Sequence, residues 1–263
     1  MAVAILNAQP VLIVGAGPTG LAAAMSLARA RVAVRLIDRA LQPAAHSRAI
    51  GIQARTLELL EQHRIVEPFL DLGHRLRAAN LYSNGHRLAR LDFDPLQTRY
   101  PYLLSLDQSV TERLLTEHLA TSGVTVERGV ELVRLTQGAS HVEATLSHAD
   151  GREETIKVPF LIAADGAHST VRHLLGMTFS GKTFEQTFSL ADVHADSDLA
   201  DDEFHIFASG EGLAALFPMG GGRHRFIADD SPMTPGVPAA AHAHANVVAD
   251  PPDGEERSPE PQA

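Results

Sequence analysis

A glycine-rich turn between an apolar strand and an alanine-rich helix constrains this sequence more than any other feature. Residues 15–20, GAGPTG, follow the apolar run VLIV and precede a predicted helix over residues 21–30. Gly15 permits the tight turn, Gly17 lets the backbone approach a pyrophosphate, and Gly20 lets the helix pack closely on the strand. The helix N-terminus offers N–H groups and a positive dipole end to phosphates. The pattern predicts the first βαβ unit of a Rossmann-like α/β fold with a parallel sheet.

A second apolar strand, predicted over residues 32–37, ends in Asp38. This acid follows the glycine turn by about twenty residues, where a carboxylate receives the adenosine ribose hydroxyls. The combination of strand, turn, helix, second strand and acid predicts dinucleotide binding far more strongly than the turn alone. NAD and FAD share the adenosine diphosphate half, so this unit does not choose between them.

A second motif, LIAADGAHSTVR, ends at Arg172. Its apolar strand over residues 160–164 places Asp165 and Gly166 in a turn, before a helix predicted to begin near Ser169. Ligands of doubly wound sheets lie at the carboxyl ends of strands, so this turn is placed to reach the same cofactor. The alternative is an ordinary strand-to-helix turn in which Asp165 lies near a capping position.

Four segments together resemble the FAD-dependent aromatic hydroxylases, the p-hydroxybenzoate hydroxylase type of flavoprotein monooxygenase. They are the GAGPTG turn, SRAIGIQARTLELLE at 47–61, QSVTERLLTEHL at 108–119 and AADGAHSTVR at 163–172, and they occur in the family's order. The resemblance extends from about residue 8 to about residue 230. It implies a Rossmann-like FAD-binding domain and part of a mixed β-sheet that forms one wall of the substrate pocket.

The resemblance also implies which residues contact the cofactor. It implies roles for Arg39 at the adenosine end, Arg48 near the flavin and pyrophosphate, Gln108 at the flavin and the Val133 main chain at the adenine. Asp165 would lie near both FAD and the incoming NAD(P)H. The complete implied set is Gly15, Ala16, Gly17, Pro18, Thr19, Gly20, Asp38, Arg39, Arg48, Gln108, Val133, Asp165 and Gly166. No catalytic acid or base is assigned.

Two of these residues have structural alternatives. Arg48 lies in a loop of small residues, where exposed arginines are common, although a pyrophosphate needs a nearby cation. Gln108 could belong to a helix start with Ser109 or Thr111 as its cap and Glu112 nearby.

The reaction implied by the resemblance uses NAD(P)H and dioxygen. Reduced FAD forms a flavin hydroperoxide, which inserts one oxygen atom into a phenolic or polycyclic aromatic ring, while the protein supplies position and dryness. The alternatives are an FAD-binding chain without turnover, an NAD-dependent dehydrogenase and a non-enzymatic interaction module.

Other function classes lack their sequence signals. The fourteen histidines form no HExxH motif or compact cluster, and cysteine is absent, so we predict no metal site and no disulfide. Neither a GxSxG elbow nor a Walker motif is present. A net charge of −10 argues against nucleic acid. The apolar N-terminal region lacks a positive start and contains the glycine turn, so we expect a cytoplasmic protein rather than a signal peptide or membrane span.

The predicted domains alternate along the chain. Residues 1–75 and 106–178 form the cofactor domain, and residues 76–105 and 179–230 form the substrate-side sheet. Within these, Asn84-Gly85 predicts a type I′ hairpin, and Asp150-Gly151 predicts another hairpin. Further strands are predicted over 184–193, 203–208, 213–218 and 223–227. Phe217, Pro218 and Met219 are candidates for the substrate pocket or for the core.

The sequence changes character after about residue 230. Residues 231–263 are rich in proline, alanine and acidic side chains, a composition typical of disorder. The family's later acidic-glycine segment and helices do not follow, so the chain is expected to be shortened and to enclose the flavin ring poorly. The apolar surface then left bare predicts self-association.

Overall fold

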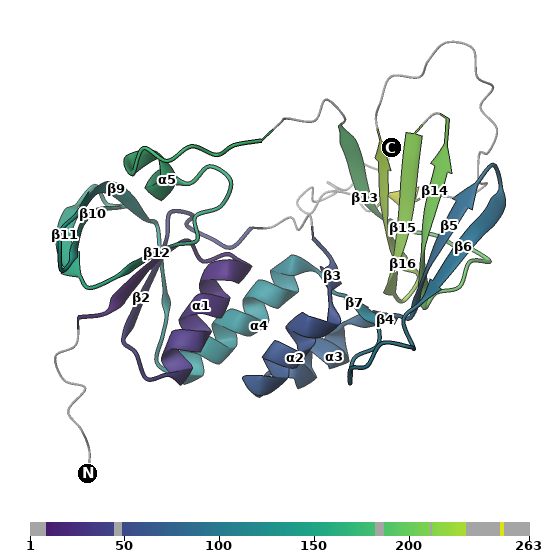
Figure 1. Ribbon diagram of the computed structural model, residues 1–263, viewed down its shortest axis with the longest axis horizontal. Helices are drawn as coiled ribbons and strands as arrows, with labels where there is room; N and C mark the ends of the chain where they lie inside the picture. The colour runs from purple at the N-terminus through teal and green to yellow at the C-terminus, as the bar shows by residue number, and fades with distance from the viewer. Residues whose placement is uncertain (1–8, 45–48, 182–186, 211, 230–247, 250–263) are drawn as a thin grey trace, which may run out of the picture. The chain divides into compact units, whose positions relative to one another are not determined.

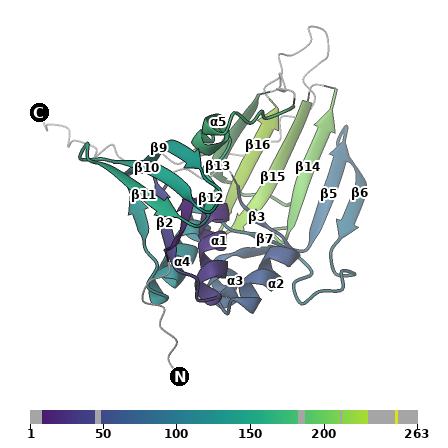
Figure 2. The same cartoon turned by 60° about the vertical axis from the view of Figure 1, so that its left-hand side comes forward.

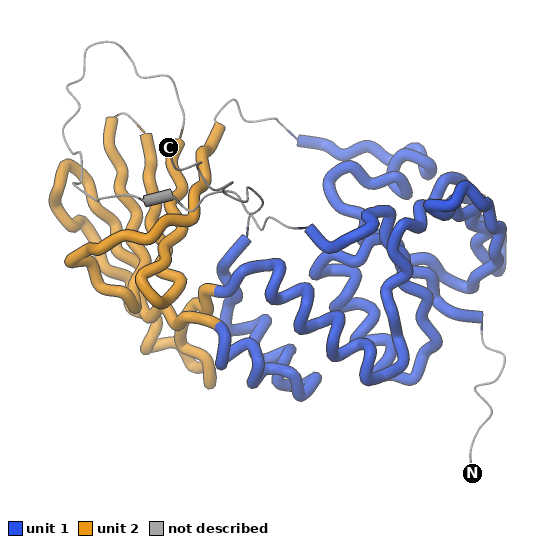
Figure 3. The backbone as a smooth tube through the Cα atoms, turned by 180° about the vertical axis from the view of Figure 1, so that it is seen from behind, with its two compact units in different colours: residues 1–72, 106–183 blue, residues 73–105, 184–263 orange. Residues whose placement is uncertain are grey.

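The computed structural model describes residues 9–44, 49–181, 187–210, 212–229 and 248–249. The chain divides into two compact units (Figure 3). The first unit contains Met1–Leu72 and Leu106–Thr183, and the second contains Gly73–Ser105 and Phe184–Ala263. Each unit is therefore assembled from two separate stretches of the chain.

The first unit contains a four-stranded parallel sheet. Its strands, in order across the sheet, are β12 (Leu161–Ala163), β1 (Val11–Val14), β2 (Val34–Asp38) and β8 (Val126–Arg128). All four residues of β1 are buried, which fits an apolar run in the interior of a parallel sheet. The predicted parallel Rossmann-like sheet is confirmed.

Helices α1 (Pro18–Arg29) and α4 (Gln108–Thr121) lie side by side in the first unit (Figure 1). Along α1, Leu21, Ala24 and Met25 are buried, a spacing that turns one helix face inward. Pro18 occupies the first helical turn, where its missing N–H costs nothing.

Two shorter helices and a two-residue strand complete the segment before residue 73. These are β3 (Gly51–Ile52), α2 (Ala54–Gln62) and α3 (Val66–Leu72). The buried side chains of α2 are Leu57 and Leu60, three residues apart on one face of the helix. Arg55 and Glu58 form an ion pair at 2.9 Å on its surface.

A three-stranded antiparallel sheet follows β8. It consists of β9 (Val130–Gln137), β10 (Val142–His148) and β11 (Glu153–Val158), with the predicted turn at Asp150-Gly151 and a φ of 83° at Gly151. The short helix α5 (Thr170–Leu174) contacts β9. One hydrophobic cluster joins side chains of both sheets and α5, among them Val14, Ile37, Leu132, Leu146 and Val171.

Arg35 connects the two sheets of the first unit. From β2, its guanidinium donates two hydrogen bonds to Glu127 on β8, at 2.8 and 2.9 Å, and two to Glu154 on β11, at 2.9 and 3.0 Å. The hydrogen bonds from Arg35 lower the pKa of Glu154 from 4.5 to about 2, and those carboxylates raise the pKa of Arg35. Glu154 is therefore held ionised against a cation that it shares with Glu127.

The second unit is built on a seven-stranded mixed sheet (Figure 2). The order across the sheet is β17 (Val248–Ala249), β13 (Phe188–His194), β16 (Arg223–Asp229), β15 (Gly212–Gly220), β14 (Glu203–Ser209), β5 (Ala78–Ser83) and β6 (His86–Asp92). Among the described strand pairs of this sheet, only β14 and β5 run parallel. A short antiparallel pair, β4 (His74–Leu76) and β7 (Leu103–Ser105), belongs to the same unit. The predicted mixed β-sheet is confirmed.

The predicted β5–β6 hairpin has the expected turn. Asn84 and Gly85 have φ angles of 49° and 77°, as a type I′ turn requires at both central positions. The last strands run one or two residues beyond their predicted ends, while residues 184–186 of the predicted 184–193 strand lie outside the described residues.

Aromatic stacking and one buried ion pair organise the sheet of the second unit. Phe217 stacks on Phe204 with ring centroids 5.1 Å apart. Arg225, whose side chain is 3% exposed, donates two hydrogen bonds to Asp192, at 2.6 and 2.7 Å. These bonds lower the pKa of the Asp192 carboxyl.

The three residues suggested for the substrate pocket take different positions on β15. Pro218 is buried, whereas Phe217 and Met219 are half-buried. The strand register shifts between Pro218 and Gly220, and the Met219 sulfur accepts a 3.7 Å contact from Arg223. Pro218 therefore packs within the sheet, whereas Phe217 and Met219 keep part of their surface exposed.

No helix in the described part of the chain is both long and apolar enough to cross a membrane. The predicted disordered segment, residues 231–263, lies outside the described residues except for β17.

Candidate functional site

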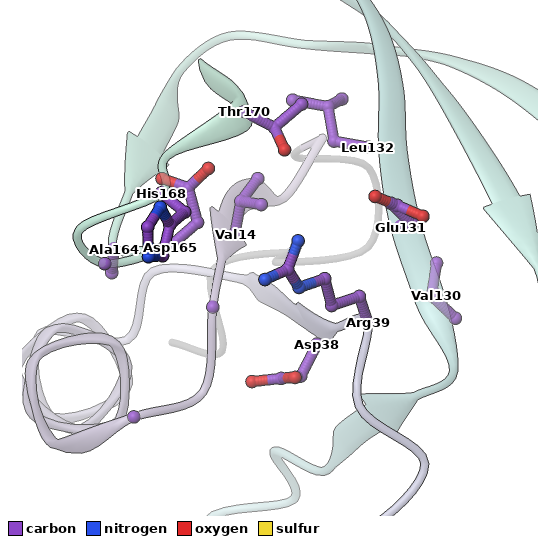
Figure 4. A pocket seen from close by; sticks show the side chains of 13 residues that line it. Val14, Asp38, Arg39, Val130, Glu131, Leu132, Ala164, Asp165, His168 and Thr170 are labelled. Carbon is purple, nitrogen blue, oxygen red and sulfur yellow. The ribbon is translucent and has the colours of Figure 1, made fainter. Parts of the chain in front are cut away.

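A cavity of about 270 Å³ lies in the first unit, where β1, β2 and β12 end. Figure 4 shows side chains from the end of β2, from β9 and from the turn before α5 arranged around one space. The lining residues are Val14, Gly15, Gly17, Asp38, Arg39, Val130, Glu131, Leu132, Ala164, Asp165, Gly166, His168 and Thr170. The glycine turn and the DG turn, far apart in sequence, therefore meet at one site.

The three glycines of the first turn meet different surroundings. Gly15 has a φ of +99°, and a Cβ there would strike the Ala164 carbonyl group. A Cβ on Gly20 would overlap the carbonyl oxygen of Gly15, so the helix packs directly on the turn. A Cβ on Gly17 would meet no atom within 4 Å, and Gly17 lines the cavity. The space beside Gly17 is thus open to a ligand, while the other two glycines are required by the fold.

Asp38 supports the glycine turn as well as facing the cavity. Its Oδ2 accepts a 2.7 Å hydrogen bond from the Ala16 amide, and its Oδ1 accepts one of 2.8 Å from the Ala40 amide. Arg39 follows it and is exposed at the cavity. The carboxylate therefore fixes the turn that precedes α1, whose first N–H groups lack partners within the helix.

Asp165 plays a structural role in the second turn. Its Oδ1 accepts a 2.6 Å hydrogen bond from the Ser169 hydroxyl, and its Oδ2 accepts one of 3.1 Å from the Val171 amide. Ser169 is the N-cap of α5 and accepts from the Arg172 amide at 3.0 Å. Asp165 therefore lies near the cap of α5, and it also lines the cavity together with Gly166, whose φ is +77°.

The sequence locates the β9 wall only approximately. Val130, Glu131 and Leu132 line the cavity, whereas the predicted contact residue Val133 does not. Val133, which is expected to contact the adenine through its main chain, directly follows these residues, and that contact stays a prediction.

Two further lining residues are missed by sequence reasoning. His168 and Thr170 follow the DG turn, and their position directly after a ligand-facing turn is the available signal. In the sequence alone, His168 is one of many scattered histidines.

Gln108, a predicted cofactor contact, does not line this cavity. Gln108 is the first residue of α4, and its side-chain amide donates a 2.8 Å hydrogen bond to Glu112. The suggested cap at Ser109 or Thr111 is wrong, because the Asp107 carbonyl accepts from the Thr111 amide and Asp107 is the N-cap. Arg48 lies outside the described residues.

These features fit the adenosine diphosphate half of a dinucleotide. A helix N-terminus and an open glycine suit a pyrophosphate, and Asp38 suits a ribose. Ligand cavities for whole drug-sized molecules measure about 300–1,000 Å³, so this cavity of about 270 Å³ suits only part of a dinucleotide.

Comparison with known proteins decides which dinucleotide family this is. A family model described as "FAD binding domain" matches residues 8–235. The chain belongs to the FAD-dependent aromatic hydroxylase family. FAD is therefore its cofactor, and the dehydrogenase alternative is set aside.

Three matches define its place among the aromatic hydroxylases. The chain is 43% identical over 210 residues to 6-methylpretetramide 4-monooxygenase of Streptomyces rimosus, covering 79% of this chain and 37% of that protein. It is 36% identical over 226 residues to pentachlorophenol 4-monooxygenase of Sphingobium chlorophenolicum, covering 84% and 42%. The structure of p-nitrophenol 4-monooxygenase from Pseudomonas putida shares the fold, with a TM-score of 0.79, 24% identity and coverage of 86% and 58%. The chain thus spans less than half the length of these two curated hydroxylases.

Proposed function

We propose that this chain takes part in the NAD(P)H-dependent hydroxylation of a phenolic or polycyclic aromatic compound by dioxygen. The observation that carries the proposal is the open position at Gly17 beside Asp38, in a cavity that the DG turn also lines. The names of the relatives support the substrate class, since they act on a pretetramide and on a chlorinated phenol.

We assign the adenosine diphosphate half of FAD to the first unit. The backbone from Gly15 to Gly20 would receive the pyrophosphate at the start of α1, and Asp38 with Arg39 would hold the adenosine ribose. Asp165 would act indirectly by fixing the turn at Gly166. Arg48, Gln108 and Val133 stay predictions from the family resemblance.

We assign the substrate side to the second unit. When bound, FAD supplies the redox and oxygen chemistry. The chain's own contribution is to hold the cofactor, to position an aromatic ring and to exclude water. The stacked aromatic rings on β14 and β15, Phe204 and Phe217, provide apolar surface suited to such a ring.

A cytoplasmic location agrees with the proposed use of NAD(P)H. Self-association is a further proposal, supported by exposed apolar side chains such as Phe188 and Leu213, which are 57% and 42% exposed. Sedimentation as a monodisperse monomer at micromolar concentration would rule it out.

The test begins with a titration of the purified 263-residue chain with FAD, in which flavin fluorescence reports binding. Saturable binding should be followed by NADH and NADPH oxidation with phenolic and polycyclic substrates, and by mass spectrometry for a product that has gained one oxygen atom. FAD binding without any hydroxylated product would instead support the alternative of a cofactor-binding chain without turnover. An inactive result with a full set of substrates would therefore refute hydroxylation but leave FAD binding standing.

A further inference from the structure

Arg128 forms an ion pair with Asp38, one of the residues that line the cavity. It is the last residue of β8, and its Cα is the register partner of Asp38 at the end of β2. Its Nη1 lies 3.6 Å from Asp38 Oδ2, and the two side chains are 20% and 17% exposed. At this distance the contact is an ion pair rather than a direct hydrogen bond.

The same carboxylate oxygen has a second task. Asp38 Oδ2 accepts the 2.7 Å hydrogen bond from Ala16, inside the glycine turn. Arg128 therefore sets the charge environment of the oxygen that holds the turn in place. Partial burial weakens solvent screening, so this pair counts for more than an exposed one.

The residues after Arg128 join the two walls of the cavity. The Gly129 amide donates a 3.2 Å hydrogen bond to the Ala40 carbonyl, while the Ala40 amide donates to Asp38 Oδ1. Val130, which lines the cavity, comes directly after Gly129. The ends of β2 and β8 are thus connected by two interactions, the backbone hydrogen bond between Gly129 and Ala40 and the ion pair between Arg128 and Asp38.

We infer that Arg128 is a positioning residue for the adenosine diphosphate half of FAD. It is not among the residues that line the cavity, so it acts through Asp38 rather than on the ligand. It holds the Asp38 carboxylate between the Ala16 and Ala40 amides, so that the ribose and the pyrophosphate meet preformed partners. The inference rests on the proposed placement of FAD.

A double-mutant cycle tests the inference, with ADP and FAD as probes in calorimetric titrations. We expect Arg128→Met to raise the Kd of both probes about 5- to 20-fold, as expected for coupled neighbours. In an Asp38→Asn background the same change should alter Kd less than about twofold, because the residue through which Arg128 acts has lost its charge. Arg128→Lys should recover most of the affinity, because it keeps the cation.

Arg134→Met is the matched control. Arg134 forms an exposed ion pair with Glu153 in the same unit, at 63% and 51% exposure, so its loss should leave both Kd values unchanged. Equal effects of Arg128→Met with and without Asp38→Asn would overturn the inference, since a merely structural role gives additive losses. Unchanged ADP binding in Arg128→Met would overturn it as well. Failure of the unsubstituted chain to bind ADP or FAD would instead remove the proposed placement itself.

Discussion

Replacing Gly17 by alanine adds one methyl group to the cavity at a point where the folded protein has room for it. Gly17 has a φ of −73° and a ψ of −178°, which alanine adopts without strain, and no atom lies within 4 Å of the added Cβ. Loss of unfolded-state freedom stabilises such a variant by about 0.4–1 kcal/mol. Gly17 is also the N-cap, where alanine is less favourable by about the same amount. We therefore expect the free energy of unfolding to change by less than about 1 kcal/mol.

The effect on FAD binding should be far larger. A methyl group beside the pyrophosphate would hold the phosphates away from the α1 N–H groups. Loss of one charge-assisted hydrogen bond costs about 1.5–3 kcal/mol, so the Kd for FAD should rise about 10- to 100-fold.

Gly20→Ala is the matched contrast. Its Cβ would overlap the Gly15 carbonyl oxygen, so the backbone must move. A loss of about 2–3 kcal/mol is expected, which lowers the Tm by about 4–12 °C for a domain of this size. Circular dichroism melts of the apo variants and fluorescence titrations with FAD separate the two effects. A Gly17→Ala protein that binds FAD like the unsubstituted chain would refute the reasoning, as would one that melts as early as Gly20→Ala.

Three further substitutions probe other contacts. Glu154→Gln should lower the free energy of unfolding by about 1–2 kcal/mol at pH 7. A pKa of about 2 in the folded protein, in place of 4.5, corresponds to a stabilisation of at most about 3.4 kcal/mol, and solvent screening reduces it because the Glu154 side chain is 30% exposed. This contribution is present above about pH 4.5 and is lost as the pH falls toward 2, so the difference in urea unfolding should shrink by more than half at about pH 3; a constant difference would contradict it. Ser169→Ala should lower the free energy of unfolding by about 0.5–2 kcal/mol, because α5 loses its N-cap, and it should also weaken FAD binding. Urea denaturation measures the first effect and FAD titration the second; unchanged stability would contradict the capping role of Ser169. Arg55→Ala should change stability by less than about 0.5 kcal/mol, since the Arg55–Glu58 pair is exposed; a loss above about 1 kcal/mol in the same assay would be inconsistent with this.

Local patterns in the sequence are enough to predict many elements. Helix α2, the Asn84-Gly85 turn and the roles of Gly15 in the tight turn and Gly20 in helix packing all depend on residues close together in the chain. Each is fixed by backbone sterics or by the period of apolar residues, so no long-range information is needed.

What the sequence does not reveal depends on pairing between distant segments. The contact between Arg128 and Asp38 follows from the register of β2 against β8, which neither strand shows on its own. The cap of α4 is misplaced in the sequence reading because Ser109 and Thr111 have good capping side chains, although the helical hydrogen bonds begin at Asp107.

The interleaved layout of the two units has a consequence for how the chain is made. Strand β1 leaves the ribosome long before β12, the neighbouring strand whose Leu161 pairs with Leu12. Strand β12 emerges only after β5 and β6 of the other unit. Until then an apolar strand has an unpaired edge, which is open to aggregation, and non-local pairing of this kind folds slowly. Cells that produce this protein should therefore gain soluble yield from slower translation or from added chaperones.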